Sequence, residues 1–246
     1  YLGTIENQEN DCKSSGDGVK NDKETGRKTK YASMTDDERI KYINTTMDTY
    51  LTDGTLKQAV ADGYVLVERT TESGVRLGIV GLIDLDDYDF DPKKKTLIRA
   101  TEGTVISRIP PRVKIRENAA IELTHVMLLV DDPIDRQKID GCQGATQEDA
   151  VNIAAVKHGI IEYVYAIRDT LRKLYDTELM QGGGHIRGYA VEGEAAKQVT
   201  EAFAAKQNSC GGFLFAVGDG NHSLATAKTC CENIKKSGKF TEEQLK

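Results

Sequence analysis

The sequence is poor in several features that would place a protein quickly in a known class. Its 246 residues include no tryptophan and four prolines. No apolar run approaches the roughly 18 residues that span a bilayer, and no charged-then-apolar leader opens the sequence as given. The net charge is −6, whereas nucleic-acid-binding proteins carry a basic footprint. We therefore expect neither a membrane nor a nucleic acid as partner.

Cysteines are too few and too irregularly spaced to form a framework. Five are present, an odd number, and Cys230 and Cys231 are adjacent, with no Cys-x-x-Cys pair. This pattern argues against both a disulfide scaffold and a zinc site. We expect a cytoplasmic protein with reduced thiols. Because the sequence begins with Tyr1 and stops shortly after a predicted helix, we also expect a fragment of a longer protein.

Composition divides the chain into two regions. Residues 6–33 are polar and nearly free of apolar side chains, so they cannot bury enough surface to offset the entropy of ordering. We predict that residues 1–33 are a disordered or linker segment; a basic binding arm is less favoured because acids and bases are interleaved. Residues 34–246 are predicted to form a single α/β domain, truncated at both ends, with a mixed α+β sheet flanked by helices.

Local patterns predict individual helices and strands. Thr35 followed by Glu38 is a capping-box pattern, and apolar residues at helical spacing continue from there to Gly54. Apolar or alternating runs predict strands, and longer periodic stretches predict helices. The further strands are Tyr64–Arg69, Val75–Leu85, Val126–Val130 and His185–Val191; the further helices are Leu56–Ala61, one near Glu148 with Thr146 as cap, Ile160–Tyr175 and one through Ala195, Val199 and Phe203.

One strand–turn–helix segment indicates function more strongly than any other part of the chain. The apolar run Phe213–Val217 leads into Gly-Asp-Gly-Asn-His-Ser, residues 218–223, and then into an Ala-rich helix. Such a turn points unpaired backbone N–H groups and the positive end of a helix dipole at an anion. It matches neither a P-loop nor a dinucleotide fingerprint, so we predict a generic phosphate cradle. The alternative is an Asx-turn in which Asn221 or Asp219 caps an ordinary helix.

Each residue of this turn has a predicted role. Asp219 is the candidate Mg²⁺ ligand and proton acceptor. His222 is the candidate acid or base, because a histidine changes its charge near neutral pH. The candidate phosphate-binding residues are the rest of the turn, Gly218, Gly220, Asn221 and Ser223.

A second candidate is an arginine-rich segment around one acid. The acid is Glu102, and the cations are Arg99, Arg108, Arg112, Lys114 and Arg116. Guanidinium groups suit phosphate and carboxylate recognition. The two prolines at 110 and 111 favour a non-helical approach, and an extended strand would place the last three cations on one face. We predict an anion-binding segment; the alternative is a solvated basic edge strand.

Two weaker groups complete the candidates. Three glycines at 182–184 precede His185 and Arg187, so a ligand could approach the backbone there, or the glycines form only a turn into a strand. Five aspartates lie between Asp84 and Asp91. Their spacing does not fit an EF-hand loop, which favours a solvated turn over a cation site.

Five separated motifs resemble those of a known family. They are Arg-Ala-Thr-Glu-Gly-Thr (99–104), Ile-Pro-Pro-Arg-Val-Lys-Ile-Arg-Glu-Asn (109–118), His-Val-Met-Leu-Leu-Val-Asp-Asp (125–132), Leu-Met-Gln-Gly-Gly-Gly-His (179–185) and Val-Gly-Asp-Gly-Asn-His-Ser (217–223). On these motifs, residues 35–240 resemble a prokaryotic family known only as a domain of unknown function, number one thousand and fifteen. The resemblance implies an incomplete chain and implies no activity.

The turn by itself resembles a wider superfamily. Strand, then Asp-Gly-Asn-His (219–222), then helix is similar to the nucleotide-phosphate turn of the ParB and sulfiredoxin superfamily. That superfamily includes CTP-hydrolysing partition proteins, ATP-using sulfiredoxins and a free-serine kinase. Ser223 stands where the superfamily usually has arginine, so Arg112 or Arg187 would have to supply the charge.

These features predict a function. We expect a cytoplasmic α/β protein that binds a nucleotide or phosphorylated metabolite and transfers or hydrolyses phosphate, with Mg²⁺ and ATP or CTP as cofactors. Glu102 or His222 would act as base, and the 99–116 segment would neutralise charge. The alternatives are a non-catalytic sensor of a small anionic ligand and a structural assembly domain whose arginines pair with the 84–91 acids.

Overall fold

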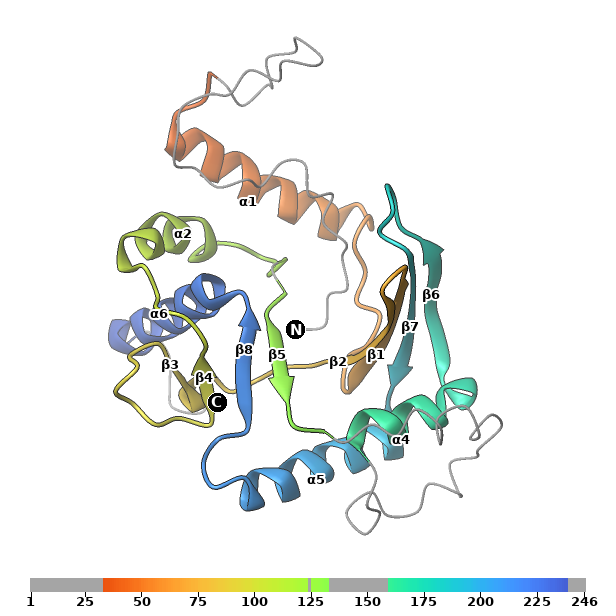
Figure 1. Cartoon of the computed structure of the whole chain (residues 1–246). Helices are drawn as coiled ribbons and strands as arrows, with labels where there is room; N and C mark the ends of the chain where they lie inside the picture. The colour runs from red at the N-terminus through yellow and green to blue at the C-terminus, as the bar shows by residue number, and fades with distance from the viewer. Residues whose placement is uncertain (1–32, 124, 133–158, 239–246) are drawn as a thin grey trace.

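The computed structural model describes residues 33–123, 125–132 and 159–238 (Figure 1). The strands of these residues form two four-stranded sheets, ordered β2-β1-β7-β6 and β3-β4-β8-β5. The predicted mixed α/β class is confirmed, although the strands divide between two sheets. The predicted linker and the helix near Glu148 lie outside the described residues, apart from Ser33. Within the described residues, no helix has the length and apolar character needed to cross a bilayer.

The first sheet is antiparallel throughout and is covered on one face by two helices. Its strands are β1 (Tyr64–Thr71), β2 (Gly74–Val80), β6 (Arg172–Glu178) and β7 (His185–Val191). The helices are α4 (Ile160–Ala166) and α5 (Gly193–Ser209), which pass below the sheet in Figure 1. Leu66 and Val191 from the strands pack with Val164 and Val199 from the helices, and all four side chains are buried.

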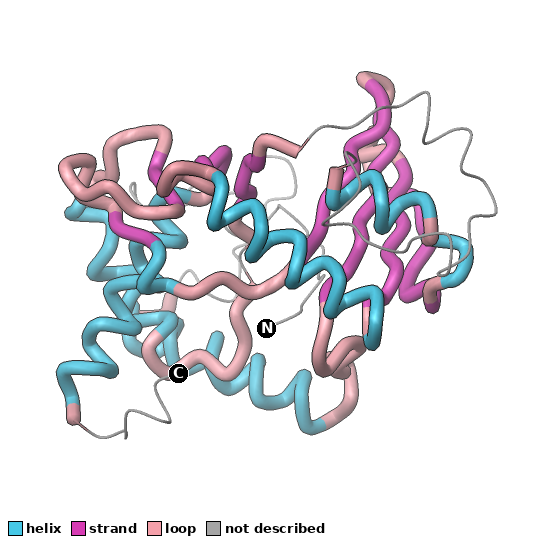
Figure 2. Tube along the Cα trace, turned by 90° about the horizontal axis from the view of Figure 1, so that it is seen from below, coloured by secondary structure: helices cyan, strands magenta, loops and turns pink. Residues whose placement is uncertain are grey.

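The second sheet is mixed and carries the glycine turn. Its strands are β3 (Tyr88–Asp89), β4 (Ile98–Ala100), β5 (Met127–Val130) and β8 (Phe215–Asp219). The order places β4 between β3 and β8, all parallel, with β5 antiparallel to β8. Helix α6 (Asn221–Ser237) follows β8 directly and buries Leu224 against Tyr88 and Val217. Figure 2 shows the two groups of strands apart from each other, with helices between and around them.

The first helix, α1 (Asp36–Thr52), begins as its local sequence predicts. The Thr35 side chain accepts from the backbone of Glu38, and the Glu38 carboxylate accepts from the backbone of Thr35, so the capping box is confirmed. The predicted helix Leu56–Ala61 is wrong, because these residues form turns and bends. Three short 3-10 turns complete the described elements: η1 (Leu85–Asp87), η2 (Ile106–Arg108) and η3 (Arg168–Thr170).

Two predicted elements are too long. The helix predicted over Ile160–Tyr175 ends at Ala166, turns through η3 and continues as strand β6 from Arg172. Backbone pairing with β7 along the edge of the sheet therefore outweighs the helical spacing of the apolar residues. Strand β2 ends at Val80 and not at Leu85.

The arginine-rich segment is a helix and not the extended strand that we predicted. Helix α2 runs from Ile109 to Arg116, and its prolines occupy the first two helical positions. Proline is tolerated there because the first N–H groups of a helix have no intrahelical partner. The last three cations therefore do not share one face by alternation. Helix α2 packs against α6, beside the start of the helix that follows the turn (Figure 1).

Candidate functional site

The glycine turn places an uncapped helix N-terminus at the end of a strand. Gly220 is the N-cap of α6, in the left-handed conformation at φ 90°, and no side chain caps the helix. The Asp219 carboxylate instead accepts from the Gly220 N–H at 2.7 Å. The alternative in which Asn221 or Asp219 caps the helix is therefore wrong. The first-turn N–H groups keep no intrahelical acceptor, which suits an anion.

Both glycines of the turn also have packing reasons. A Cβ on Gly220 would lie 3.3 Å from Val126 Cα, and the positive φ disfavours any other residue. A Cβ on Gly218 would lie 3.0 Å from the Leu129 side chain. Close approach of strand β5 thus accounts for part of the glycine content that the sequence assigned to a ligand.

The loop between β4 and α2, residues 101–105, lies on the turn. Because β4 and β8 are parallel, the residues that follow them emerge at the same edge of the sheet. The Thr101 hydroxyl donates to the Val217 carbonyl at 2.6 Å, and the Val105 N–H donates to His222 Nε2 at 3.1 Å. Glu102 belongs to this loop, which we call the Glu102 loop. The Glu102 loop therefore folds back onto the turn.

The hydrogen bond from Val105 fixes the protonation of His222. A ring nitrogen that accepts an N–H carries no proton, so the imidazole is neutral with its proton on Nδ1. While this bond persists, Nε2 is not available to take a proton from a substrate. The geometry thus gives His222 a positioning contact where the sequence predicted an acid or base.

A buried polar atom without a partner lies at the start of the helix that follows the turn. The side chain of Asn221, 3 % exposed, has an Oδ1 with no hydrogen bond. The Tyr88 hydroxyl contacts the Thr104 hydroxyl, and burial and the charge of Asp89 raise the pKa of Tyr88 to about 12. Buried polar groups are normally paired, so unpaired ones call for an explanation such as a missing ligand.

The predicted arginines have different surroundings. Arg99 donates to the carbonyls of Thr96 and Gly212 and lies over the Phe213 ring, before β8 begins, so its guanidinium is at the opposite end of the strand from the turn. Arg116 contacts the turn region, pairing with Glu122 and donating to the Ser223 carbonyl at 3.5 Å.

Two further arginines lie on or beside helix α2. The Arg112 guanidinium donates to the Arg108 carbonyl within the helix, and Arg108 itself is the helix N-cap. Arg108 is exposed and Arg112 is half-buried.

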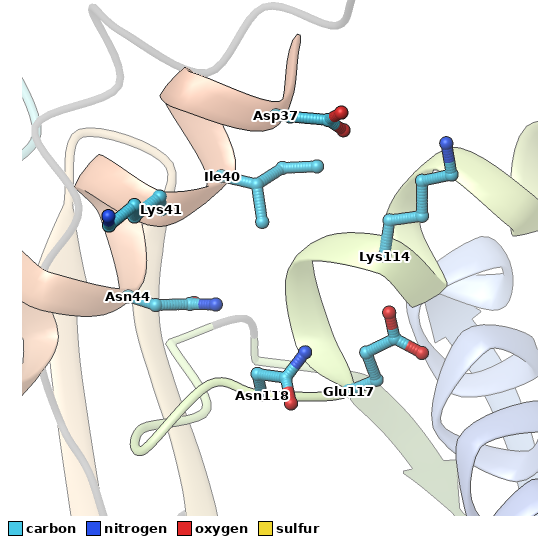
Figure 3. Close-up of a pocket in the computed structure, with 7 residues that line it drawn as sticks. All are labelled: Asp37, Ile40, Lys41, Asn44, Lys114, Glu117 and Asn118. Carbon is cyan, nitrogen blue, oxygen red and sulfur yellow. The ribbon is translucent and has the colours of Figure 1, made fainter.

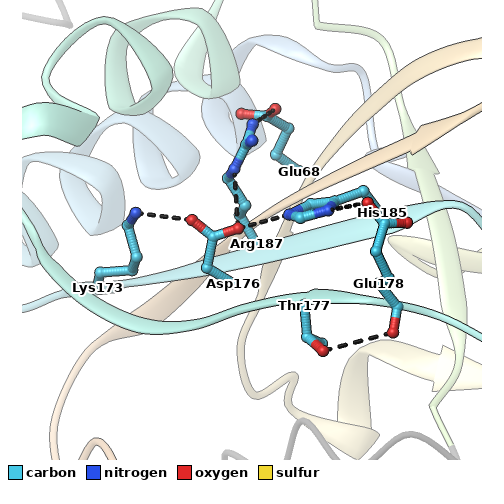
Figure 4. Close-up of polar contacts among 7 residues, drawn as sticks. All are labelled: Glu68, Lys173, Asp176, Thr177, Glu178, His185 and Arg187. Atoms are coloured by element: carbon cyan, nitrogen blue, oxygen red, sulfur yellow. Dashed lines mark hydrogen bonds and ion pairs between the residues drawn. The ribbon is translucent and has the colours of Figure 1, made fainter.

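His185 and Arg187 belong to the first sheet and not to the turn (Figure 4). They point toward Asp176 on the neighbouring strand, with His185 Nε2 at 2.5 Å and Arg187 Nε at 3.2 Å from Asp176 Oδ1. His185 Nδ1 also lies 2.7 Å from Glu178, and Arg187 donates to buried Glu68 at 2.9 Å. We call these five residues the cross-strand ladder.

Charges within the ladder shift the pKa values of its members. Glu178 and then Asp176 raise the pKa of His185, while Lys173 and His185 lower that of Asp176. Since carboxylates only accept hydrogen bonds, a ring bonded to one at each nitrogen must be an imidazolium. The charged groups of the ladder are therefore paired with one another. His185 and Arg187 were predicted to bind a ligand, but the structure does not bring them to the turn.

The acidic run is a bonded turn. Asp86 pairs with Lys228 and Lys235 of α6, and Asp89 pairs with Lys94. These acids thus pair with lysines, whereas the assembly alternative needed the arginines of the 99–116 segment. Among the described residues, no cluster of three His, Cys, Asp or Glu side chains could hold a metal ion.

A crevice of about 350 Å³ separates α1 from α2 (Figure 3). Asp37, Ile40 and Asn44 of α1 point toward α2 across it, and Lys114, Glu117 and Asn118 line the other side. Because acidic, basic and amide side chains line this crevice, we interpret it as a solvated contact between the two helices.

Sequence reasoning missed the residues that tie the site together. Thr101 bonds to Val217 at the end of β8, and Val105 bonds to His222 of the turn. The only available signal was their position beside Glu102 in the Arg-Ala-Thr-Glu-Gly-Thr motif.

Comparison with known proteins identifies a family without adding an activity. No curated protein and no solved structure matches the chain. The profile of one family, described as "Protein of unknown function (DUF1015)", matches residues 24–173 and, in a second overlapping match, residues 150–245. These matches span most of the chain, as the five motifs predicted, and the chain therefore belongs to that family.

Proposed function

We propose that the turn at residues 218–223 binds a phosphorylated small molecule, with a nucleotide as the first candidate. One observation carries the proposal: the uncapped N-terminus of α6 coincides with the buried, unpaired side chain of Asn221. The N–H groups of a first helical turn stabilise a phosphate. The unpaired atom, Oδ1, is an acceptor, and leaving it unpaired costs stability. A donor other than the phosphate itself, such as a ribose hydroxyl, a base amino group or a Mg²⁺-bound water, would satisfy it. The resemblance of residues 219–222 to the ParB and sulfiredoxin turn favours the same ligand class.

The acids around the turn favour a divalent cation as a companion of the ligand. Asp219 and Glu102 are exposed carboxylates on the turn and on the loop above it. An anion beside two carboxylates is repelled unless a cation lies between them. Mg²⁺ characteristically binds one or two carboxylates together with substrate phosphates, so Asp219 with the ligand would suffice without a protein cage.

Phosphoryl transfer is the activity that this arrangement would support. Transfer depends on positioning and on neutralising charge. With His222 Nε2 occupied by the Val105 N–H, Glu102 is the better candidate for the base. A non-catalytic sensor would use the same turn without turnover. The cytoplasm remains the proposed location, consistent with the free cysteines Cys210, Cys230 and Cys231.

Urea unfolding in the presence of ligands tests the proposal. Pyrophosphate, ATP and CTP, each with and without Mg²⁺, should raise the free energy of unfolding, by about 2.7 kcal/mol at a hundredfold excess over Kd. Asn221→Leu should lose this stabilisation, whereas Asn44→Leu, which changes the unpaired amide in the α1–α2 crevice, should keep it. The proposal fails if none of these ligands stabilises the protein, or if Asn221→Leu responds like the wild type.

Phosphate release measured on the same samples separates an enzyme from a sensor. Turnover that is lost in Glu102→Gln, with ligand stabilisation retained, identifies an enzyme. Stabilisation without turnover in the wild type identifies a sensor.

A further inference from the structure

The Glu102 loop is fastened to the body of the protein by two hydrogen bonds of different kinds. The Thr101 hydroxyl bonds to a main-chain carbonyl, which does not titrate. The Val105 N–H bonds to the His222 ring, whose accepting nitrogen exists only while the imidazole is neutral. The hydrogen bond between Val105 and His222 therefore forms only while His222 Nε2 carries no proton.

We propose that His222 is a proton-operated latch that holds the Glu102 loop over the N-terminus of α6 and releases it when the ring is protonated. A proton on Nε2 would face the Val105 N–H, and two donors cannot bond. The imidazolium would also lie in the first turn of α6, where the helix dipole disfavours a cation and favours an anion. Protonation of His222 would thus release the loop and also make the N-terminus of α6 bind an anion more strongly.

The latch regulates the proposed phosphate site, and that part of the inference rests on the proposed function. Binding of a proton and binding of an anion should favour each other, because coupling between two binding equilibria is reciprocal.

Other charged groups surround the latch and must be separated from it. They are Glu102 on the loop, Asp219 at the end of β8, Arg116 on α2 and His125, whose carbonyl approaches Gly220. One of these groups, His125, is a second histidine. It therefore needs its own control.

Hydrogen exchange of the Val105 amide tests the latch without any ligand. The wild-type protection factor, corrected for the intrinsic exchange rate, should fall at least several-fold between about pH 8 and about pH 5.5. His222→Gln offers an accepting oxygen that does not titrate, so protection should persist across the range. His222→Leu should be unprotected throughout, and His125→Gln should behave like the wild type. Protection that does not change with pH, or that falls equally in His222→Gln, overturns the latch.

Sulfate binding in the presence of Mg²⁺ tests the coupling, because sulfate keeps its charge over this pH range. Its affinity should rise on acidification, within the about 5- to 150-fold range of typical coupling, in wild type and not in His222→Gln. A pH-dependent latch together with no sulfate binding at any pH refutes the proposed function and leaves the latch intact. Sulfate affinity that rises equally in both proteins refutes the coupling.

Discussion

Asn221→Leu should make the protein more stable while it removes ligand binding. Asn221 is 3 % exposed, begins helix α6 and has an unpaired Oδ1. Leaving a buried polar atom without a partner costs about 1–3 kcal/mol. Leucine has the same branched side-chain skeleton, contains no polar atom and suits a helix, so the substitution removes this cost, while its bulkier methyl groups offset part of the gain. We expect the free energy of unfolding to rise by about 1–2 kcal/mol.

Urea and thermal unfolding without ligand measure this effect. For a chain of this size, each kcal/mol should raise Tm by about 2–4 °C. Asn44→Leu is the matched comparison, since Asn44 Oδ1 is also unpaired but lies in the α1–α2 crevice. A loss of stability in Asn221→Leu would refute the reasoning, because it would show that the amide is already satisfied in the free protein and does not wait for a ligand.

Three further substitutions test the fold around the site. Gly184→Ala should lower the free energy of unfolding by more than the about 1–2 kcal/mol that a left-handed backbone costs an alanine, because the new Cβ would lie 1.9 Å from the Thr70 carbonyl oxygen. Gly182 is also left-handed, but the space around it is open, so Gly182→Ala should show only the cost of the backbone conformation in urea unfolding. Asp132→Ala should cost about 0.5–2 kcal/mol, since both carboxylate oxygens cap α4, and a smaller midpoint shift in Asp132→Asn would confirm the capping role. The pKa of His185 is raised in the folded protein, so its charge stabilises the fold most at low pH. As the pH rises from about 6 to above the pKa of His185 in the folded protein, the free energy of unfolding of the wild type should fall relative to that of His185→Gln. Unfolding at several pH values measures this difference, and a difference that is constant with pH would contradict the charged ladder.

Elements with locally encoded ends are predicted well from the sequence. Strand β7 is predicted from His185 to Val191 and is found there. Glycines precede it and Glu192-Gly193 follows it, so both boundaries are fixed by neighbouring residues. The start of α1 is predicted for the same reason, because Thr35 and Glu38 bond to each other. The ends of an element can be predicted from a single sequence when they depend on residues only a few positions away.

Elements that depend on distant partners are not. Residues 160–175 have apolar side chains at helical spacing, yet the last of them pair with β7 as a strand. Residues 109–116 begin with prolines that read as helix breakers, although the first turn of a helix tolerates them. In the first case the structure is decided by pairing with a strand about 15 residues downstream. In the second it is decided by the position of the prolines within the helix.

The candidate site divides in the same way. The order of strand, turn and helix at 213–237 follows from the local sequence, although the strand lies at Phe215–Asp219 and not at the predicted Phe213–Val217. The absence of a side-chain cap on the helix did not follow, because the sequence also allowed Asn221 or Asp219 as the cap. The contact of Thr101 and Val105 with the turn requires β4 to lie parallel to β8, which no local pattern encodes. The separation of His185 from the turn follows likewise from its placement in the other sheet.

Satisfaction of polar groups is the reason why we propose the turn, and not the cross-strand ladder, as the ligand site. The cross-strand ladder has more charged side chains than the turn, but each is bonded to another, from Glu68 through Arg187 to Asp176 and His185. Such a closed network gains nothing from a ligand and would have to break bonds to bind one. The turn has few charges, and its first-turn amides and Asn221 lack partners. Disrupting the ladder should therefore lower stability without changing ligand affinity, whereas Asn221→Leu should do the reverse.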